Sequence, residues 1–192
     1  MKEIVKLGVI LLVVCIIAAV ALAFTNELTK DQISIQRDLA SEEARKSILP
    51  SAESFKLLDE GKLNEIISKN NKVSEVFVGY KGDSIVGYTF KTLPAGYAGT
   101  IEIMTGIVID GKVSGVRVGN HQETPGLGAK AGEEEFSGQF TGKKGVKLVK
   151  GTATNDDEVS AIAAATITSR AIVDGANQAI EVSGIIMESK ND

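Results

Sequence analysis

A run of small residues beside hydroxyl side chains lies near the C-terminal end of the chain. Residues 163–169 read Ala-Ala-Ala-Thr-Ile-Thr-Ser, and a helical pattern follows them. The first turn of a helix has backbone N–H groups without internal partners, and the helix dipole favours negative charge there. A hydroxyl at Thr166 or Thr168 therefore suits an anionic phosphate. The alternative is simple close packing of a helix start, with Ser160 or Thr168 as the N-cap.

A second candidate segment, residues 119–131, is rich in glycine and contains His-Gln-Glu-Thr-Pro-Gly-Leu-Gly. Gly126 and Gly128 can adopt a positive φ or let a ligand approach the backbone closely. Leu127 lies between them and would present an apolar side chain to a planar ring. Thr124 and the loop amides offer hydrogen bonds to ring oxygens and nitrogens. The alternative is a tight surface loop without a ligand.

Several ionisable residues accompany these two segments. His121 is the only histidine, and a lone histidine at a strand end is more often a structural hydrogen-bonding group than a catalytic one. Glu123 either anchors the loop or is solvated, and the sequence leaves both open. Lys130, Lys143 and Arg170 could pair with a phosphate, although each could equally be solvated.

The composition excludes several classes of site. The chain has 192 residues, a net charge of −4, one cysteine and no tryptophan. One cysteine and one histidine exclude intrachain disulfides, zinc clusters and iron–sulfur ligation on ligand count, so we expect no metal site. Interspersed charge and few aromatic residues argue against binding of nucleic acid. No dinucleotide-binding fingerprint is present, and no catalytic cluster stands out. Demanding chemistry must come from a bound group.

Residues 7–24 contain no charged side chain. As a helix this run would span roughly 27 Å, close to the hydrocarbon thickness of a bilayer. Lys2 and Lys6 precede it, and the charges that follow nearly balance, so we expect the N-terminus in the cytoplasm and the remainder outside the cell membrane. A cleaved signal peptide is the alternative, because Ala-Leu-Ala at 21–23 fits a cleavage pattern.

The remaining pattern predicts an α+β domain with a mainly antiparallel sheet. Residues 25–49 lack glycine and proline, which predicts that the membrane helix continues as a stalk until Pro50. Asp110-Gly111 is the strongest hairpin signal in the chain. Strands are predicted at 73–80, 84–92, 101–109, 112–118 and 146–149, and helices at 62–68, 132–140 and 168–182. The expected organisation is a transmembrane anchor at 1–24, a helical stalk and connecting region at 25–71, and an extracytoplasmic domain at 72–192.

Three segments of the chain resemble the motifs of the FMN-binding domain family. They are Asn-His-Gln-Glu-Thr-Pro-Gly-Leu-Gly-Ala-Lys at 120–130, Ala-Thr-Ile-Thr-Ser-Arg at 165–170 and Gly-Tyr-Ala-Gly at 96–99. With an N-terminal anchor and this length, the whole chain is similar to the RnfG family, which comprises the G subunits of Rnf electron transport complexes. The NqrC family, which comprises the C subunits of Na⁺-pumping NADH:quinone reductases, is related but usually longer.

The resemblance implies a covalent FMN, joined through its phosphate to Thr166 by a dedicated flavin transferase outside the cytoplasm. It implies that the loop from Thr124 to Gly128, with Gly126 and Leu127, packs beside the isoalloxazine, and that Thr168 and Ser169 belong to the same cofactor site. It also implies that the protein transfers electrons inside a membrane complex that links ferredoxin and NAD⁺ and translocates ions. The protein would then have no turnover on its own, because contact with ferredoxin or NAD⁺ belongs to other subunits.

The chain departs from the family pattern just before the acceptor threonine. The usual run is Asp-x-x-Ser-Gly-Ala-Thr, whereas this chain has Ser160 for the acidic residue and alanine for both serine and glycine, at Ala163 and Ala164. Alanine is close in size to both, so the turn is kept unless it requires the positive φ of glycine. Two alternatives follow: a flavin-free assembly subunit of the same kind of complex, and a free-standing extracellular flavoprotein reductase.

Overall fold

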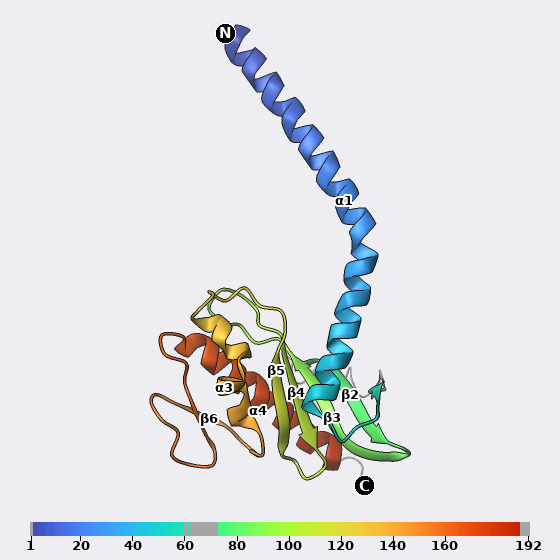
Figure 1. Ribbon diagram of the computed structural model, residues 1–192, viewed down its shortest axis with the longest axis vertical. Helices are drawn as coiled ribbons and strands as arrows, with labels where there is room; N and C mark the ends of the chain where they lie inside the picture. The colour runs from blue at the N-terminus through green and yellow to red at the C-terminus, as the bar shows by residue number, and fades with distance from the viewer. Residues whose placement is uncertain (1, 60, 62–72, 189–192) are drawn as a thin grey trace. The chain divides into compact units, whose positions relative to one another are not determined.

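The computed structural model describes residues 2–59, 61 and 73–188. The chain forms two compact units, Met1–Glu43 and Ala44–Asp192. The helix predicted at 62–68 lies outside the described residues. Figure 1 shows the order of the elements along the chain.

One continuous helix, α1, runs from Lys2 to Ile48. It is long and apolar enough to cross a membrane. Every side chain from residue 2 to residue 40 is exposed in this chain, so the apolar run at 7–24 needs a cover, which a bilayer would provide. The helix continues past residue 24 because no glycine or proline interrupts it, and it ends two residues before Pro50. The predicted stalk is therefore helical.

A five-stranded antiparallel sheet forms the centre of the second unit, with its strands in sequential order. The strands are β1 (Ser54–Leu57), β2 (Val73–Lys81), β3 (Ser84–Thr92), β4 (Ile103–Val108) and β5 (Val113–Val118). The predicted turn at Asp110-Gly111 joins β4 to β5, and Gly111 has a φ of +81° there. The edge strand β1 was not predicted, because four residues of mostly exposed side chains give no clear alternation.

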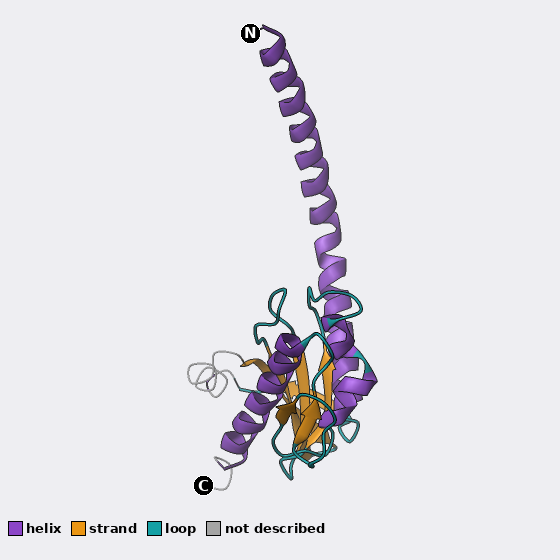
Figure 2. Cartoon of the chain, turned by 90° about the vertical axis from the view of Figure 1, so that its left-hand side faces the viewer, coloured by secondary structure: helices purple, strands orange, loops and turns teal. Residues whose placement is uncertain are grey.

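The helix α4 (Thr166–Glu188) covers one face of the sheet (Figure 2). It begins two residues earlier and ends six residues later than the predicted helix at 168–182. The buried side chains of this helix, which include Ile172, Ala176 and Ala179, pack on large side chains of β3 and β4. Those of the sheet include Tyr88, Phe90, Ile103 and Ile107. Gly175 allows the close approach, because a Cβ there would lie 2.7 Å from the Thr92 hydroxyl oxygen.

The opposite face of the sheet receives the last turn of α1 along a row of four glycines. These residues, which we call the glycine row, are Gly79, Gly87, Gly106 and Gly115, one on each of β2 to β5. A Cβ at Gly79 would lie 2.6 Å from the Leu49 side chain, and one at Gly106 would lie 2.5 Å from the Ile48 carbonyl oxygen. The Ser114 hydroxyl donates a hydrogen bond to that same carbonyl. The absence of side chains along the row therefore lets residues 44–49 pack directly on the backbone of the sheet.

Short elements fill the connection between β5 and α4. They are η1 (Gly128–Gly132), α3 (Glu134–Ser137), η2 (Gly138–Phe140), β6 (Lys147–Val149) and β7 (Glu158–Ser160). The helix predicted at 132–140 is found as two consecutive short helices, α3 and η2. They bury Phe136 and Phe140, whose rings lie edge to face with centroids 5.6 Å apart. β6 was predicted, whereas its parallel partner β7 was not.

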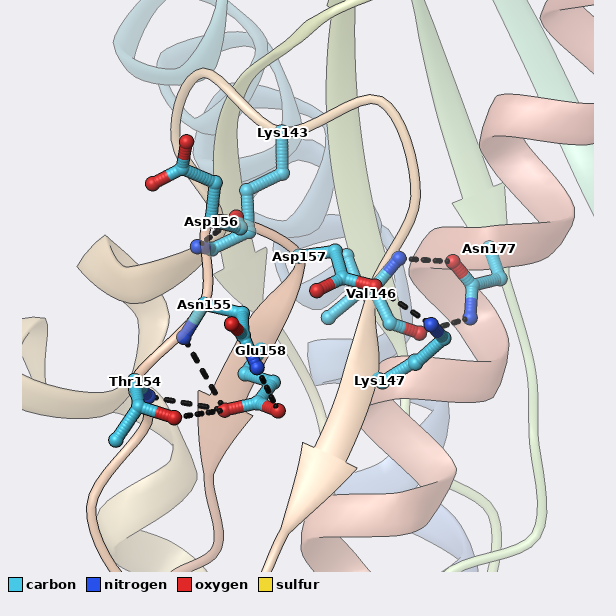
Figure 3. A network of polar contacts seen from close by, with 9 residues as sticks. All are labelled: Lys143, Val146, Lys147, Thr154, Asn155, Asp156, Asp157, Glu158 and Asn177. Carbon is cyan, nitrogen blue, oxygen red and sulfur yellow. Dashed lines mark hydrogen bonds and ion pairs between the residues drawn. The ribbon is translucent and has the colours of Figure 1, made fainter.

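Polar contacts hold this connection in place (Figure 3). The Asn177 side chain of α4 accepts a hydrogen bond from the Val146 N–H at 2.9 Å and donates one to the Val146 carbonyl at 2.8 Å. The Glu158 carboxylate accepts hydrogen bonds from the backbone N–H groups of Thr154 and Asn155 and from both of their side chains. These bonds lower the pKa of Glu158 to about 2, with the Thr154 N–H as the main cause.

Candidate functional site

A tight turn precedes α4. The Ala165 N–H donates to the Ile162 carbonyl at 3.0 Å, and Ala164 has a φ of +61°. Because Ala163 has a negative φ, this is a type II turn, whose third residue is normally glycine. Ala164 is the only non-glycine residue with a positive φ among the described residues. The alanine therefore keeps the conformation of a glycine turn at a cost of about 1 kcal/mol.

Thr166 is the first residue of α4 and is half-buried. Within the described residues no group forms a hydrogen bond with its hydroxyl, and no side chain caps the N–H groups of Thr166, Ile167 and Thr168. Neither proposed N-cap fills this role. Thr168 lies inside the helix, and the Ser160 hydroxyl accepts a hydrogen bond from the Ala153 N–H instead. The start of α4 thus offers a hydroxyl and unpartnered N–H groups together, which is an arrangement suited to an anion.

Ser169 joins this turn to the helix. Its hydroxyl donates to the Ala165 carbonyl at 2.9 Å and accepts from the Ile162 N–H at 3.0 Å. The side chain is fully buried. The predicted site residue Ser169 therefore fixes the geometry of the turn that carries Thr166.

The glycine-rich loop forms a second type II turn. The Leu127 N–H donates to the Thr124 carbonyl at 3.1 Å, and Gly126 has a φ of +78° at the third position. Pro125 occupies the second position, which its fixed φ favours. Leu127 is 42% exposed, so an apolar side chain projects from this loop, as the sequence predicted. Gly128 is buried and begins η1.

The Glu123 carboxylate connects this loop to two other segments. Its Oε2 accepts a hydrogen bond from the Thr168 hydroxyl at 2.6 Å, across 45 residues of sequence. Its Oε1 accepts from the N–H groups of Tyr97 and Ala98 at 2.9 and 3.0 Å. Thr168 is 1% exposed and Glu123 is 6% exposed. Of the two roles left open for Glu123, the structure therefore shows the anchoring role.

The surroundings keep this carboxylate ionised. Burial raises the pKa of Glu123, but the hydrogen bonds from Thr168, Ala98 and Tyr97 outweigh burial, so the pKa lies below its usual value. His121 accepts a hydrogen bond at Nδ1 from the Glu123 N–H at 3.2 Å, in agreement with the structural role expected for it.

The three cations that could pair with a phosphate, Lys130, Lys143 and Arg170, lie in different parts of the domain. Lys130 lies in η1 and Arg170 in the first turns of α4, and both are exposed. The Lys143 ammonium instead donates to the Asp156 carbonyl in the connection between β6 and β7 (Figure 3). Lys130 and Arg170 therefore lie on the elements that form the candidate site, whereas Lys143 belongs to another polar network.

Two family models match the chain. The FMN-binding domain model matches residues 96–181, which include all three segments that meet at Glu123, and the RnfG N-terminal region model matches residues 1–48. The G subunit of the Na⁺-translocating ferredoxin:NAD⁺ oxidoreductase complex of Acetobacterium woodii is 39% identical, over 94% of this chain and 92% of its own length. The chain belongs to the RnfG family. Another relative, the G subunit of the ion-translocating oxidoreductase complex of Methanosarcina acetivorans, is 34% identical over 94% of both chains.

Solved structures of a related family share the fold. The crystal structure of NqrC from Shewanella oneidensis matches 76% of this chain and 94% of its own, with a TM-score of 0.57 and 19% identity. The crystal structure of the C subunit of the Na⁺-translocating NADH-quinone reductase from Parabacteroides distasonis matches 80% of this chain and 94% of its own, with a TM-score of 0.57 and 22% identity. The α+β fold predicted from the sequence is therefore confirmed as the fold of an FMN-binding domain.

The sequence indicated Thr166, Thr168, Ser169 and the Thr124–Gly128 loop as candidate site residues, but it did not indicate how they are connected. The sequence carried only a weak sign that Glu123 connects these segments, namely two glycines far apart in the chain. Gly96 and Gly128 both lie against Glu123, since a Cβ at either would come within 2.5 Å of a carboxylate oxygen. Two distant glycines that flank one carboxylate become meaningful only once the fold brings them together.

Proposed function

We propose that this RnfG-family protein carries FMN as a phosphoester on Thr166 and passes electrons within a membrane complex. The observation that supports this most directly concerns the start of α4, next to a glycine-type turn: none of the described residues caps it or forms a hydrogen bond with the Thr166 hydroxyl. In this proposal residues 1–24 anchor the chain, and the remainder lies outside the cytoplasm. That remainder is the stalk and connecting region at 25–71, of which residues 44–49 and 54–57 belong to the folded unit, and the domain at 72–192. The predominance of positive charge before the apolar run supports that orientation.

The residues present fit the chemistry of FMN. The N–H groups at the start of α4 and the helix dipole would stabilise the phosphate, with Lys130 and Arg170 as exposed cations on the adjoining elements. Tyr97 and Ile167 are 72% and 55% exposed and, like Leu127, offer apolar surface to a flat ring. When bound, the flavin supplies reversible electron transfer, while the protein fixes its position and polarity.

Attachment requires an activated flavin donor. The Thr166 oxygen would attack the phosphorus of a flavin nucleotide that carries a phosphoanhydride bond. A P–O ester bond forms, the anhydride bond breaks, and the leaving phosphate takes the bonding electron pair. The threonine proton passes to solvent or to a base of the flavin transferase. The net change to the chain is the addition of FMN minus one water.

The test uses full-length protein produced in a host that has a flavin transferase. We expect the band to remain fluorescent under ultraviolet light after denaturing electrophoresis, and the tryptic peptide that begins at Gly151 to gain the mass of FMN minus water. Thr166→Val should abolish the label and Thr166→Ser should keep it, because serine retains the hydroxyl. A bare polypeptide from the native host, or a label on another residue, would contradict the assignment.

The alanines at 163 and 164 specifically favour one other function, that of a flavin-free assembly protein. In that case the wild-type chain would assemble with the other subunits of the complex but carry no fluorescence. Restoring the family residues with Ala163→Ser and Ala164→Gly would then introduce the label. A wild-type chain that is fully labelled removes this alternative.

A further inference from the structure

Three segments that are distant in sequence meet at one carboxylate behind the candidate flavin site. The Glu123 side chain accepts hydrogen bonds from the Tyr97 and Ala98 N–H groups and from the Thr168 hydroxyl. Thr168 is two residues beyond Thr166 in the first turn of α4, and Glu123 directly precedes the turn that presents Leu127. The start of α4 and the Thr124–Leu127 turn, which are the two halves of the candidate site, are therefore both connected to Glu123: the first through a hydrogen bond and the second through the chain.

The carboxylate has a place built for it. Gly96 and Gly128 leave room on either side, because a Cβ at Gly96 would lie 2.5 Å from Oε1 and one at Gly128 would lie 2.4 Å from Oε2. Among the described residues no lysine or arginine forms an ion pair with Glu123, so hydrogen-bond dipoles provide most of its stabilisation. A buried charge held in this way is costly to leave unsatisfied, which makes the three contacts strongly interdependent.

We propose that Glu123 is a positioning residue for the modification of Thr166, an inference that rests on the proposed function. Glu123 does not contact the Thr166 hydroxyl. Through Thr168 it fixes the rotation of the first turn of α4, and through Tyr97 and Ala98 it fixes the adjacent segment. The flavin transferase and the flavin then meet the acceptor hydroxyl and the Thr124–Leu127 turn in one fixed arrangement. Small displacements of a reacting group reduce rates by up to about a hundredfold, so this contact should control the rate of labelling.

The experiment measures the initial rate of covalent labelling of the full chain, per amount of folded protein, with transferase and flavin donor saturating. We expect Glu123→Ala and Thr168→Val each to lower the rate tenfold or more. Thr168→Ser should stay within about twofold of wild type, because serine retains the hydroxyl that Glu123 accepts from. The double variant should be no slower than Glu123→Ala, since both changes remove the same contact.

Val76→Ala is the matched control for loss of stability, because Val76 is fully buried in the sheet core and takes no part in the hydrogen bonds of Glu123. It should lower thermal stability but leave the labelling rate of folded protein unchanged. Wild-type rates in Glu123→Ala, or an equal loss in Val76→Ala, would overturn the positioning role. So would a double variant whose loss is the product of the two single losses.

Hydrogen exchange provides a measurement that does not depend on flavin. In unlabelled Thr166→Val protein, adding Thr168→Val should speed exchange at the Tyr97 and Ala98 amides, whereas adding Thr168→Ser should not. Unchanged exchange would show that Glu123 does not connect the segments, even if labelling occurs. An unlabelled wild-type chain would instead contradict the proposed function, and the exchange result would still decide whether Glu123 connects them.

Discussion

The carbonyl oxygen of Ile48 lies only 2.5 Å from the position that a Cβ on Gly106 would occupy. The same Cβ would also lie 2.5 Å from the Ser114 hydroxyl oxygen, which donates to that carbonyl. The last turn of α1 and the strand β4 are thus in direct backbone contact. Any side chain on Gly106 has to displace one of them.

We therefore predict that Gly106→Ala destabilises the domain by about 1–3 kcal/mol, the usual cost of overpacking. The change should also increase trypsin cleavage after Arg45 and Lys46, because the end of α1 can no longer lie flat on the sheet. Gly132→Ala is the control, since a Cβ there meets nothing within 4 Å. Denaturant unfolding of the full chain in detergent and limited proteolysis measure the two effects. Equal stability of both variants would contradict the prediction.

The turn before Thr166 predicts opposite effects at two neighbouring alanines. Ala164→Gly should stabilise the protein by up to about 1 kcal/mol, because it relieves a left-handed alanine. Ala163→Gly should destabilise it by about 0.5–1 kcal/mol, because φ is negative there and glycine only adds freedom to the unfolded chain. Thermal unfolding of the two variants side by side measures both signs. Changes of the same sign would show that the turn does not carry this strain.

The Asn177 side chain should stabilise the segment between η2 and β6, because it binds the backbone of Val146 there. Asn177→Ala leaves the Val146 N–H and carbonyl without their partner, so we expect a loss of about 1–3 kcal/mol and faster amide exchange at Val146. Asp174→Ala is the control on the same helix, because Asp174 is exposed, and it should change stability by less than about 0.5 kcal/mol. Protection of Val146 that survives in Asn177→Ala would contradict this role.

The loop at 154–158 should respond to acid through Glu158. Its pKa is lowered in the folded chain to about 2 from an ordinary value of 4.5. The ionised carboxylate therefore orders the loop fully above about pH 4.5, and this contribution is lost as the pH falls through about 2. NMR titration of the Glu158 carboxyl carbon should give a midpoint near 2, and Glu158→Gln should remove the acid-dependent exchange of the Thr154 and Asn155 amides. A midpoint near 4.5 would rule out these hydrogen bonds in solution.

Local patterns in the sequence were sufficient for much of the fold. The charge-free run at 7–24, the hairpin at Asp110-Gly111 and the helical spacing after Thr168 each depend on neighbours in sequence, and each prediction agrees with the structure. The helix predicted at 132–140 is divided into α3 and η2, because its apolar residues fit a single helix although the backbone changes from an α-helix to a 3₁₀-helix at Gly138. β7 is three residues long and pairs only with β6, so it has no pattern of its own.

The candidate site was predictable in its parts but not in its assembly. The residue types identified Thr166 and the Pro-Gly turn, because hydroxyls and glycines carry specific chemistry. The bond between Glu123 and Thr168 spans 45 residues and depends on how α4 docks on the sheet. The positive φ of Ala164 was equally hidden, because alanine gives no sign of a conformation that glycine normally adopts.

The glycine row has a practical consequence for any soluble fragment of this protein. A truncation that starts at residue 72, where the sequence alone sets the domain boundary, would delete Ile48 and Leu49 and expose a bare strip across four strands. A truncation placed just ahead of Ala44 would retain them. The segment from residue 44 to residue 49 is thus as much a part of the folded body as any strand, although it is continuous with the membrane helix.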